Sequence, residues 1–309
     1  MLVTGGAGFI GSHLVYALLE RGDRVRVLDD FSTGKRANLA PLESQIELIE
    51  GSLLEPQALA RAVAGVDCVF HEAALASVPR SLEFPLDTHA ACATGTLILL
   101  DAARRAGVRR LVYAASSAAY GNQPTPKKSE TARPEPISPY GAAKLAAEHY
   151  CLAFHASYGF EAVALRYFNV FGPRQDADSP YSAVIPLFVK ALLAGQSPVI
   201  YGDGTQSRDF TFVANVVRGN LLAADAPRAP GKVINVAMGS SINLLDLLDH
   251  LQRLLGTQIA PRFEPPRAGD VRESIADISL AREILKYEPQ VGFAEGLERS
   301  IAYYLEGAQ

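Results

Sequence analysis

A glycine-rich turn near the start constrains this chain more than any other feature. Residues 1–4 form a short apolar run, residues 4–11 read TGGAGFIG, and apolar residues then recur at helical spacing through residues 10–21. The turn contains the pattern G-x-G-x-x-G at Gly6, Gly8 and Gly11. Glycines in this position allow a tight bend and let a pyrophosphate approach the backbone, while the following helix offers free N–H groups. The segment therefore predicts a strand–turn–helix unit that binds a dinucleotide.

Strand and helix signals alternate through the first half of the chain. Further short apolar runs lie near residues 24–28, 46–49, 66–70, 111–114 and 162–166, with helical patterns between them. Because these runs are apolar throughout, they predict parallel strands that are buried on both faces by helices. After about residue 170, prolines and glycines cluster and the pattern loosens. We therefore expect an α/β fold with a Rossmann-like doubly wound parallel sheet and a smaller α/β substrate-binding lobe.

Composition excludes several classes of protein. With 309 residues, 49% of them hydrophobic, and a net charge of −4, the chain is not disordered and has no excess of basic residues for binding nucleic acid. Cys68, Cys92 and Cys151 are far apart, which disfavours disulfides and metal sites and indicates a reducing compartment. No apolar run is long enough to span a membrane, and residues 1–11 lack the pattern of a signal peptide. We expect a cytoplasmic protein with no membrane or nucleic-acid partner.

An acidic residue at the end of the second predicted strand points to the kind of dinucleotide. Asp29 lies 18 residues after Gly11, where a carboxylate accepts hydrogen bonds from the adenosine ribose hydroxyls. A 2′-phosphate at the same place would be repelled by this charge. The sequence therefore favours NAD over NADP.

A tyrosine and a lysine four residues apart suggest acid–base chemistry. Tyr140 and Lys144 lie on one face of a predicted helix, and Ser116 lies at the carboxyl end of a predicted strand, the edge where such sheets bind ligands. The ammonium and a positive nicotinamide are expected to lower the Tyr140 pKa toward neutrality, so that it acts as a general base. Each of these motifs taken alone also fits a surface pair or a serine-rich turn.

The motifs together resemble one family. TGGAGFIG, Asp29, SSAAYG (116–121), SPYGAAK (138–144), RYFNVFGPRQ (166–175) and GDGTQSRDF (202–210) occur in this order. They are similar to those of the extended short-chain dehydrogenases/reductases, and within them the nucleotide-sugar 4-epimerases. The resemblance implies that Ser116, Tyr140 and Lys144 are the catalytic set. It also implies that the C4 hydride of a UDP-hexose passes to bound NAD and returns to the other face of a 4-keto sugar.

The resemblance also implies binding residues and domain limits. The cofactor-binding set is Gly5, Gly8, Phe9, Ile10, Gly11, Asp29, Ser32, Ala73, Tyr140, Lys144 and Tyr167. The substrate-binding set is Ser77, Ser116, Asn169, Arg208, Arg267, Asp270 and Ser274. The NAD-binding domain is expected to comprise residues 1–169 and about 211–236, and the nucleotide-sugar lobe about 170–210 and 237–309.

Two positions bear on which sugar is accepted. Residues 75–81, LASVPRS, are similar to the run in epimerases of N-acetylated sugars, so Ser77 and Ser81 are candidate sugar contacts. At position 274 the family uses a bulky tyrosine to exclude a 2-acetamido group, and this chain has Ser274. The resemblance therefore implies that UDP-GlcNAc and UDP-GalNAc are accepted as well as UDP-glucose and UDP-galactose.

Some readings stay open, and some positions depart from the family. Dehydratases and decarboxylases on this scaffold need an acid beside the catalytic serine, and residues 117–119 are Ser-Ala-Ala. Simple epimerisation is therefore favoured. UDP-glucuronate 4-epimerisation, a related nucleotide-sugar dehydratase or decarboxylase, a dehydrogenase that releases NADH and a regulator without catalysis remain alternatives. Ser52 and Cys92 stand where the family has Asp and Asn. A homodimer is expected through two long helices, near residues 85–106 and 140–158.

Overall fold

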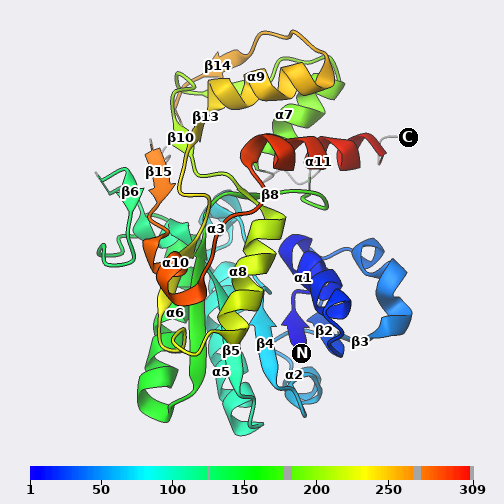
Figure 1. Ribbon diagram of the computed structural model, residues 1–309, viewed down its shortest axis with the longest axis vertical. Helices are drawn as coiled ribbons and strands as arrows, with labels where there is room; N and C mark the ends of the chain where they lie inside the picture. Colours follow the sequence, from blue (N-terminus) through cyan, green and yellow to red (C-terminus); the bar gives the residue numbers. More distant parts are fainter. Residues whose placement is uncertain (124, 177–182, 267–272, 307–309) are drawn as a thin grey trace.

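The computed structural model describes residues 1–123, 125–176, 183–266 and 273–306 (Figure 1). Its centre is a seven-stranded sheet in the order β12-β7-β5-β4-β1-β2-β3, with every neighbouring pair parallel. The strands are β1 Leu2–Thr4, β2 Val25–Asp29, β3 Ile46–Glu50, β4 Cys68–His71, β5 Arg110–Ser116, β7 Glu161–Tyr167 and β12 Val233–Val236. The order reverses between β1 and β4, which is the ligand-binding point of a doubly wound sheet.

Helices cover both faces of this sheet because consecutive strand residues point to opposite sides. Val3, Phe70 and Val112 pack with α1 Phe9–Glu20 and α8 Val213–Asp225. Their neighbours Leu2, Val69 and Leu111 pack on the other side. The helices on that side are α2 Pro56–Val63, α5 Gly95–Arg105 and α6 Pro139–Tyr158. The expected Rossmann-like doubly wound sheet is confirmed.

The helix expected near residues 85–106 is interrupted in its middle. It consists of α4 Pro85–His89, a π-helical turn at Ala90–Thr94 and α5, and it follows the short α3 Val78–Glu83. Such turns often mark functional sites, and this one packs against α6. Within the described ranges, no helix combines the length and the apolar character needed to cross a membrane.

The second lobe is built from small sheets and three longer helices. A four-stranded sheet has the order β13-β10-β15-β6, and β8 pairs with β11 and β9 with β14. The strands are β6 Lys127–Lys128, β8 Val170–Phe171, β9 Val199–Tyr201, β10 Ser207–Arg208, β11 Thr211–Phe212, β13 Ile242–Asn243, β14 Arg262–Glu264 and β15 Glu273–Ala276. The helices are α7 Val184–Leu193, α9 Leu244–Leu255 and α11 Phe293–Glu306, with the short α10 Ser279–Leu285 below them (Figure 1). β6 lies in the first half of the chain but pairs with β15 in this lobe. The chain therefore crosses between the two lobes more often than the expected domain limits indicated.

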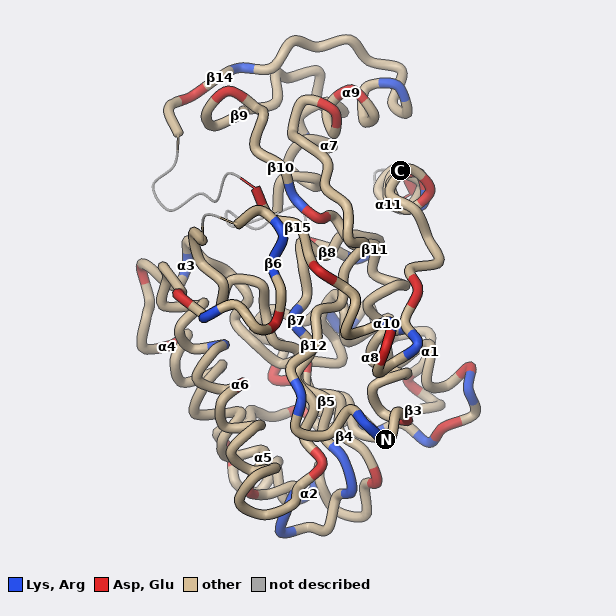
Figure 2. Tube along the Cα trace, turned by 60° about the vertical axis from the view of Figure 1, so that its left-hand side comes forward, with Lys and Arg blue, Asp and Glu red and all other residues tan. Residues whose placement is uncertain are grey.

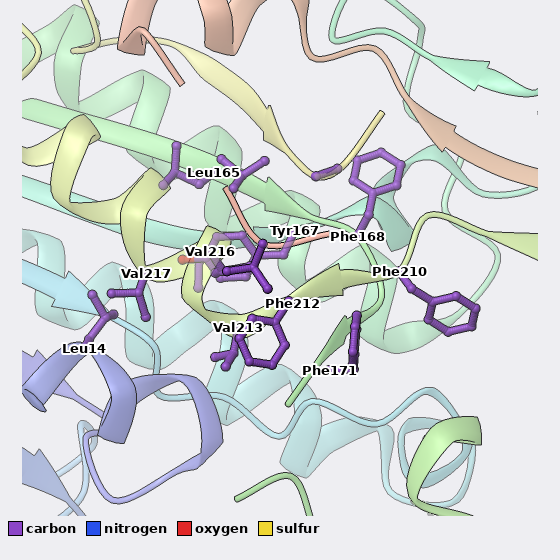
Figure 3. Close-up of a cluster of buried hydrophobic side chains, with 14 of the residues drawn as sticks. Leu14, Leu165, Tyr167, Phe168, Phe171, Phe210, Phe212, Val213, Val216 and Val217 are labelled. Carbon is purple, nitrogen blue, oxygen red and sulfur yellow. The ribbon is translucent and has the colours of Figure 1, made fainter. Parts of the chain in front are cut away.

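Aromatic rings fill the junction between the lobes. Phe171 of β8 lies 5.6 Å from Phe212 and 6.4 Å from Phe210, and Phe293 of α11 completes the group at 5.8 Å from Phe210. Figure 3 shows Phe171, Phe210 and Phe212 together with Tyr167 and Phe168 from the end of β7. The junction therefore forms one apolar core with the helices over the main sheet.

A buried ion pair fastens α6 to the sheet. Arg166 of β7 donates to Glu148 of α6 from Nε (2.8 Å) and Nη2 (2.6 Å), and both side chains are almost fully buried. The Arg166 guanidinium also lies over the Tyr120 ring, 4.5 Å from its centroid. This bidentate pair fixes the rotation of α6 and therefore the direction of every side chain on its first turns.

Replacing Glu148 by Gln leaves the Arg166 charge buried without a counter-charge. We expect the free energy of unfolding, measured by chemical denaturation, to fall by about 3 kcal/mol. The matched control is Glu283→Gln, which breaks the exposed pair of Arg228 and Glu283 (3.2 Å). That change should cost less than about 0.5 kcal/mol, and equal losses in the two variants would contradict this account.

Candidate active site

The glycine-rich turn has the close backbone packing that its sequence predicts. Gly5 has a φ of +68°, and a Cβ atom there would lie 2.6 Å from the backbone nitrogen of Ala73. A Cβ atom at Gly11 would lie only 2.1 Å from the carbonyl oxygen of Gly5. The loop, the end of β4 and the first turn of α1 therefore approach one another without side chains between them.

The start of α1 is suited to hold an anion. The backbone N–H groups of Phe9 and Ile10 make no hydrogen bond within the described parts of the chain. Asp29 supports the loop from β2, since its Oδ2 accepts from Ala7 N–H and its Oδ1 from Phe31 N–H, both at 2.8 Å. Each carboxylate oxygen keeps a further lone pair for a ribose hydroxyl. Burial raises the Asp29 pKa, and the two N–H donors act against this.

Ser116, Tyr140 and Lys144 converge at the carboxyl edge of the sheet, as the sequence indicated. Ser116 ends β5, its hydroxyl accepts from Ala118 N–H (3.1 Å), and its side chain acts to lower the Tyr140 pKa. Ser138 caps α6 by accepting from Gly141 N–H (3.1 Å), which places Tyr140 and Lys144 on its first turns.

Lys144 is held by packing rather than by an ion pair. Its side chain is buried, and Nζ lies 4.5 Å from the centroid of the Tyr113 ring. Nζ has no hydrogen bond to any residue that the structure describes, so it is available to a ligand. Burial lowers the Lys144 pKa.

Burial dominates the Tyr140 pKa in the chain by itself. We expected Lys144 and a bound nicotinamide to lower the Tyr140 pKa toward neutrality. Without a ligand, burial instead raises this pKa well above its ordinary value, and the Ser116 side chain opposes the rise only in part. The residues of the chain alone therefore do not make Tyr140 a base at neutral pH.

A chain of buried hydrogen bonds connects the loop to the π-helical turn. Thr96 Oγ1 donates to the Cys92 carbonyl (2.6 Å) and so accepts from His71 Nε2 (2.8 Å), which leaves His71 Nδ1 to accept from Thr4 Oγ1 (2.7 Å). Burial lowers the His71 pKa to about 3, so the ring stays neutral. Cys92 is buried against Tyr140, which agrees with a space-filling role.

Sequence reasoning missed Glu72, which lies directly after β4. The Tyr167 hydroxyl donates to Glu72 Oε1 (2.8 Å) and accepts from Asn220 Nδ2 (2.6 Å). Tyr167 was expected at the cofactor, and the structure places it at this edge of the sheet. The sequence did contain a signal that could have identified Glu72. It is an acidic residue that directly follows a buried strand, in the run HEAA at residues 71–74.

The expected substrate residues fall into several places. Arg208 of β10 is the direct neighbour of Ser274 of β15, so their side chains lie on one face of the small sheet. Asn169 is exposed between β7 and β8. Arg267 and Asp270 lie outside the described residues.

Three serines near these sites are engaged locally. Ser77 caps α3 by accepting from Arg80 N–H (3.2 Å), and the Ser32 hydroxyl donates to Asp30 (2.6 Å). Ser81 is fully buried and donates to the Val78 carbonyl (2.7 Å). Ser81 is therefore not a sugar contact.

Asp209, also missed, organises the strands around Arg208. Its carboxylate accepts from the N–H groups of Met238 and Gly239 (both 2.9 Å) and of Ala276 (3.2 Å). Burial raises its pKa to about 6 against these donors. Because Asp209 is adjacent to Arg208, this cluster fixes the strand that carries the arginine.

Comparisons with known proteins agree with this geometry. Residues 1–237 match the model of the NAD dependent epimerase/dehydratase family. The chain is 37% identical to the UDP-glucose 4-epimerase of Mycolicibacterium smegmatis, over 100% of this chain and 99% of that one. A solved UDP-N-acetylglucosamine 4-epimerase of Methanobrevibacter ruminantium, in complex with UDP-N-acetylmuramic acid, has a TM-score of 0.95 at 40% identity (99% and 98% covered). The UDP-glucuronic acid 4-epimerase of Bacillus cereus, with UDP-glucuronic acid and NAD, has a TM-score of 0.92 at 33% identity (99% and 98% covered).

The packing at Gly11 makes a prediction about cofactor retention. Gly11→Ala should reduce the NAD that copurifies, measured after denaturation by chromatography, by about tenfold or more, because the added Cβ atom displaces the Gly5 carbonyl. Gly292→Ala is the matched control, since a Cβ atom there meets nothing within 4 Å. An unchanged NAD content in Gly11→Ala would show that the loop does not hold the cofactor.

Proposed function

Because this chain belongs to the NAD dependent epimerase/dehydratase family, we propose that it reversibly interconverts the C4 epimers of UDP-hexoses. UDP-glucose and UDP-galactose are the central pair, with UDP-GlcNAc and UDP-GalNAc as a second. Two of the relatives act on UDP-glucose and UDP-N-acetylglucosamine, as their names state. The observation that carries the proposal is the convergence of Ser116, Tyr140 and Lys144 beside the glycine-rich loop.

The residues present fit NAD as the resident cofactor. The N–H groups of Phe9 and Ile10 would hold the pyrophosphate, Asp29 the adenosine ribose, and Lys144 Nζ a hydroxyl at the reacting end. Asp29 would repel a 2′-phosphate, which favours NAD over NADP. When bound, NAD supplies the oxidising power that removes a hydride from C4 and returns it.

The protein supplies the proton chemistry. Tyr140, as phenolate, accepts the proton of the C4 hydroxyl and gives it back after the sugar has turned. Ser116, which acts to lower the Tyr140 pKa, is placed to hydrogen-bond that hydroxyl. Lys144 and the positive charge of the oxidised cofactor offset the burial that otherwise raises the Tyr140 pKa.

The residues after Ser116 favour simple epimerisation over elimination. Ser117, Ala118 and Ala119 form a short helical turn, and none of them supplies the acid that expels water or assists decarboxylation.

Arg208 and Asn169 are proposed to bind the UDP diphosphate, with Arg267 and Asp270 completing the nucleotide site. We also propose that residues 1–169 and about 211–236 form the cofactor domain and that the remaining residues form the sugar-nucleotide lobe.

UDP-glucuronate is the second candidate substrate. The similarity to a UDP-glucuronic acid 4-epimerase over 99% of this chain favours it. The two proposals differ in whether the pocket accommodates a carboxylate at C6. Turnover of UDP-glucose, UDP-GlcNAc and UDP-glucuronate, compared under identical conditions, distinguishes them.

Ser274 tests the proposed sugar range. Because it adjoins Arg208, a tyrosine in its place would extend over the sugar side of the small sheet. Ser274→Tyr should lower kcat/KM for UDP-GlcNAc by about tenfold or more and change the value for UDP-glucose by less than about threefold. Ser274→Ala, which keeps the position small, is the control and should leave both values nearly unchanged. Equal losses on both sugars would refute the proposed gating role.

The protein is also proposed to be a cytoplasmic homodimer. Its three cysteines are unpaired and buried, which supports a reducing compartment. The only charged residues of α6, Lys144 and Glu148, are buried, and α4 to α6 carry few charges (Figure 2). Beside them Leu82, Phe84 and Leu86 expose 64%, 49% and 82% of their surface. A second copy would cover this apolar face.

Charge placed on that face should separate the dimer. Leu86→Arg is expected to shift the protein from dimer to monomer in analytical ultracentrifugation at micromolar concentration. Phe263→Arg, at a residue 54% exposed on β14, is the control and should leave the dimer intact. A wild-type protein that sediments as a monomer would overturn the proposal.

A further inference from the structure

Asn235 is a fully buried polar residue with no part in the proton chemistry proposed above. It lies on β12, the edge strand of the seven-stranded sheet, and its side chain has no exposed surface. Burying an amide group costs free energy unless its donors and acceptors find partners. The partners that Asn235 has found therefore indicate what it does in this fold.

The amide group of Asn235 joins segments that are far apart in the chain. Its Nδ2 donates to the carbonyl oxygens of Lys128 (3.0 Å) and Asp277 (3.1 Å), and its Oδ1 accepts from the Tyr120 hydroxyl (2.7 Å). The orientation of the amide is fixed, because two carbonyl oxygens can only accept and so must face its NH2 group. Burial raises the pKa of Tyr120 to about 12, which keeps its hydroxyl protonated as the donor.

The backbone around Asn235 strengthens the same connection. Its N–H group donates to Glu130 Oε1 (2.8 Å), which ties β12 to the segment after β6. Asp277 N–H donates to the Lys128 carbonyl (2.8 Å), so β6 and β15 are bonded to each other where the amide reaches them. Together these bonds form the Asn235 bridge, which runs from Tyr120 through Asn235 to Lys128 and Asp277.

The Tyr120 end of the Asn235 bridge reaches the proposed catalytic residues. Tyr120 ends the short helical turn that follows Ser116, and Ser116 caps this turn by accepting from Ala118 N–H (3.1 Å). The same turn packs closely on α6, since a Cβ atom at Gly141 would lie 2.8 Å from the Ala118 carbonyl oxygen. Gly141 directly follows Tyr140. The turn that Tyr120 ends is therefore in contact with the elements that carry Ser116 and Tyr140.

The other end of the Asn235 bridge reaches the strands proposed to bind the sugar nucleotide. β15 pairs with β6 on one side and with β10 on the other, and Asp277 directly follows β15. Arg208 of β10 is the direct neighbour of Ser274 of β15. One buried amide thus lies between the turn after Ser116 and the small sheet.

We propose that Asn235 is a positioning residue that sets the sugar-binding strands at the correct distance from Ser116 and Tyr140. It acts through Tyr120 on one side and through β15 on the other, and the inference rests on the proposed function for its effect on turnover. Without the Asn235 bridge the catalytic and binding side chains are all still present, but their relative placement changes. A small misplacement of reacting groups lowers the rate strongly.

The first experiment is a kinetic comparison of two tyrosine variants. Tyr120→Phe breaks the Asn235 bridge at one bond, so kcat for UDP-glucose should fall about tenfold while KM changes by less than about threefold. KM is preserved because Asp209 holds the strand of Arg208 without Tyr120. The matched control is Tyr287→Phe, which removes the hydroxyl of another buried tyrosine, one that donates to the Ala237 carbonyl (3.1 Å). It should lower the thermal unfolding midpoint similarly and leave kcat nearly unchanged.

An unchanged kcat in Tyr120→Phe, or an equal loss of kcat in Tyr287→Phe, would overturn the inference. A double-variant cycle tests whether Tyr120 acts through Asn235. Asn235→Ala removes the whole Asn235 bridge, so adding Tyr120→Phe to it should lower kcat by less than about twofold further. Two losses that multiply would contradict the inference.

Hydrogen–deuterium exchange, measured by mass spectrometry, tests the Asn235 bridge without turnover. In Tyr120→Phe, exchange should become about threefold faster or more in residues 116–121 and in residues 273–278, although the chain separates them widely. Tyr287→Phe should leave exchange in residues 116–121 unchanged. Unchanged exchange of either segment in Tyr120→Phe would overturn the inference. Faster exchange of both in a protein without epimerase activity would instead refute the proposed function and leave the Asn235 bridge standing.

Discussion

Parallel strands end at the same edge of their sheet, and every element of the proposed active site depends on this constraint. Thr4, Asp29, Glu72 and Ser116 each end or directly follow a strand, and they come together although the chain separates them. The edge is open where the strand order reverses between β1 and β4. Only glycine at positions 5 and 11 lets the backbone come close enough there for a pyrophosphate.

The helix that carries Tyr140 and Lys144, the proposed catalytic pair, must be fixed relative to this edge. Apolar packing alone leaves an alanine-rich helix free to rotate, and Arg166 with Glu148 removes that freedom. Asp209 has a comparable role in the small sheet, where three backbone donors hold the strand of Arg208. In both places a buried charge is accepted at a cost in desolvation, and bidentate or multiple hydrogen bonds offset it. These buried charges are explained by the positioning of α6 and of the strand of Arg208 more than by a gain in the free energy of unfolding.

Local sequence patterns predicted the parts of the site that lie within one turn or one helix. The glycine turn, Asp29 at a strand end, and Tyr140 with Lys144 on one helix face are all such cases, and the structure places them as expected. Glu72 and Asp209 escaped prediction because their partners are distant in sequence: Tyr167 for Glu72, and the backbone of Met238, Gly239 and Ala276 for Asp209. The π-helical turn at 90–94 was missed because apolar periodicity continues through it. The effect of burial on the Tyr140 pKa was not foreseen either, because burial is a property of the whole fold and not of the local sequence.

The central claim is that the cofactor stays bound and returns to C4 the hydrogen it removes. The most direct measurement incubates the purified protein, without added NAD, with UDP-glucose carrying deuterium at C4. The account predicts UDP-galactose that retains the deuterium, with no NADH appearing in solution in proportion to product. Loss of the label to solvent, or release of one NADH for each sugar converted, would contradict it.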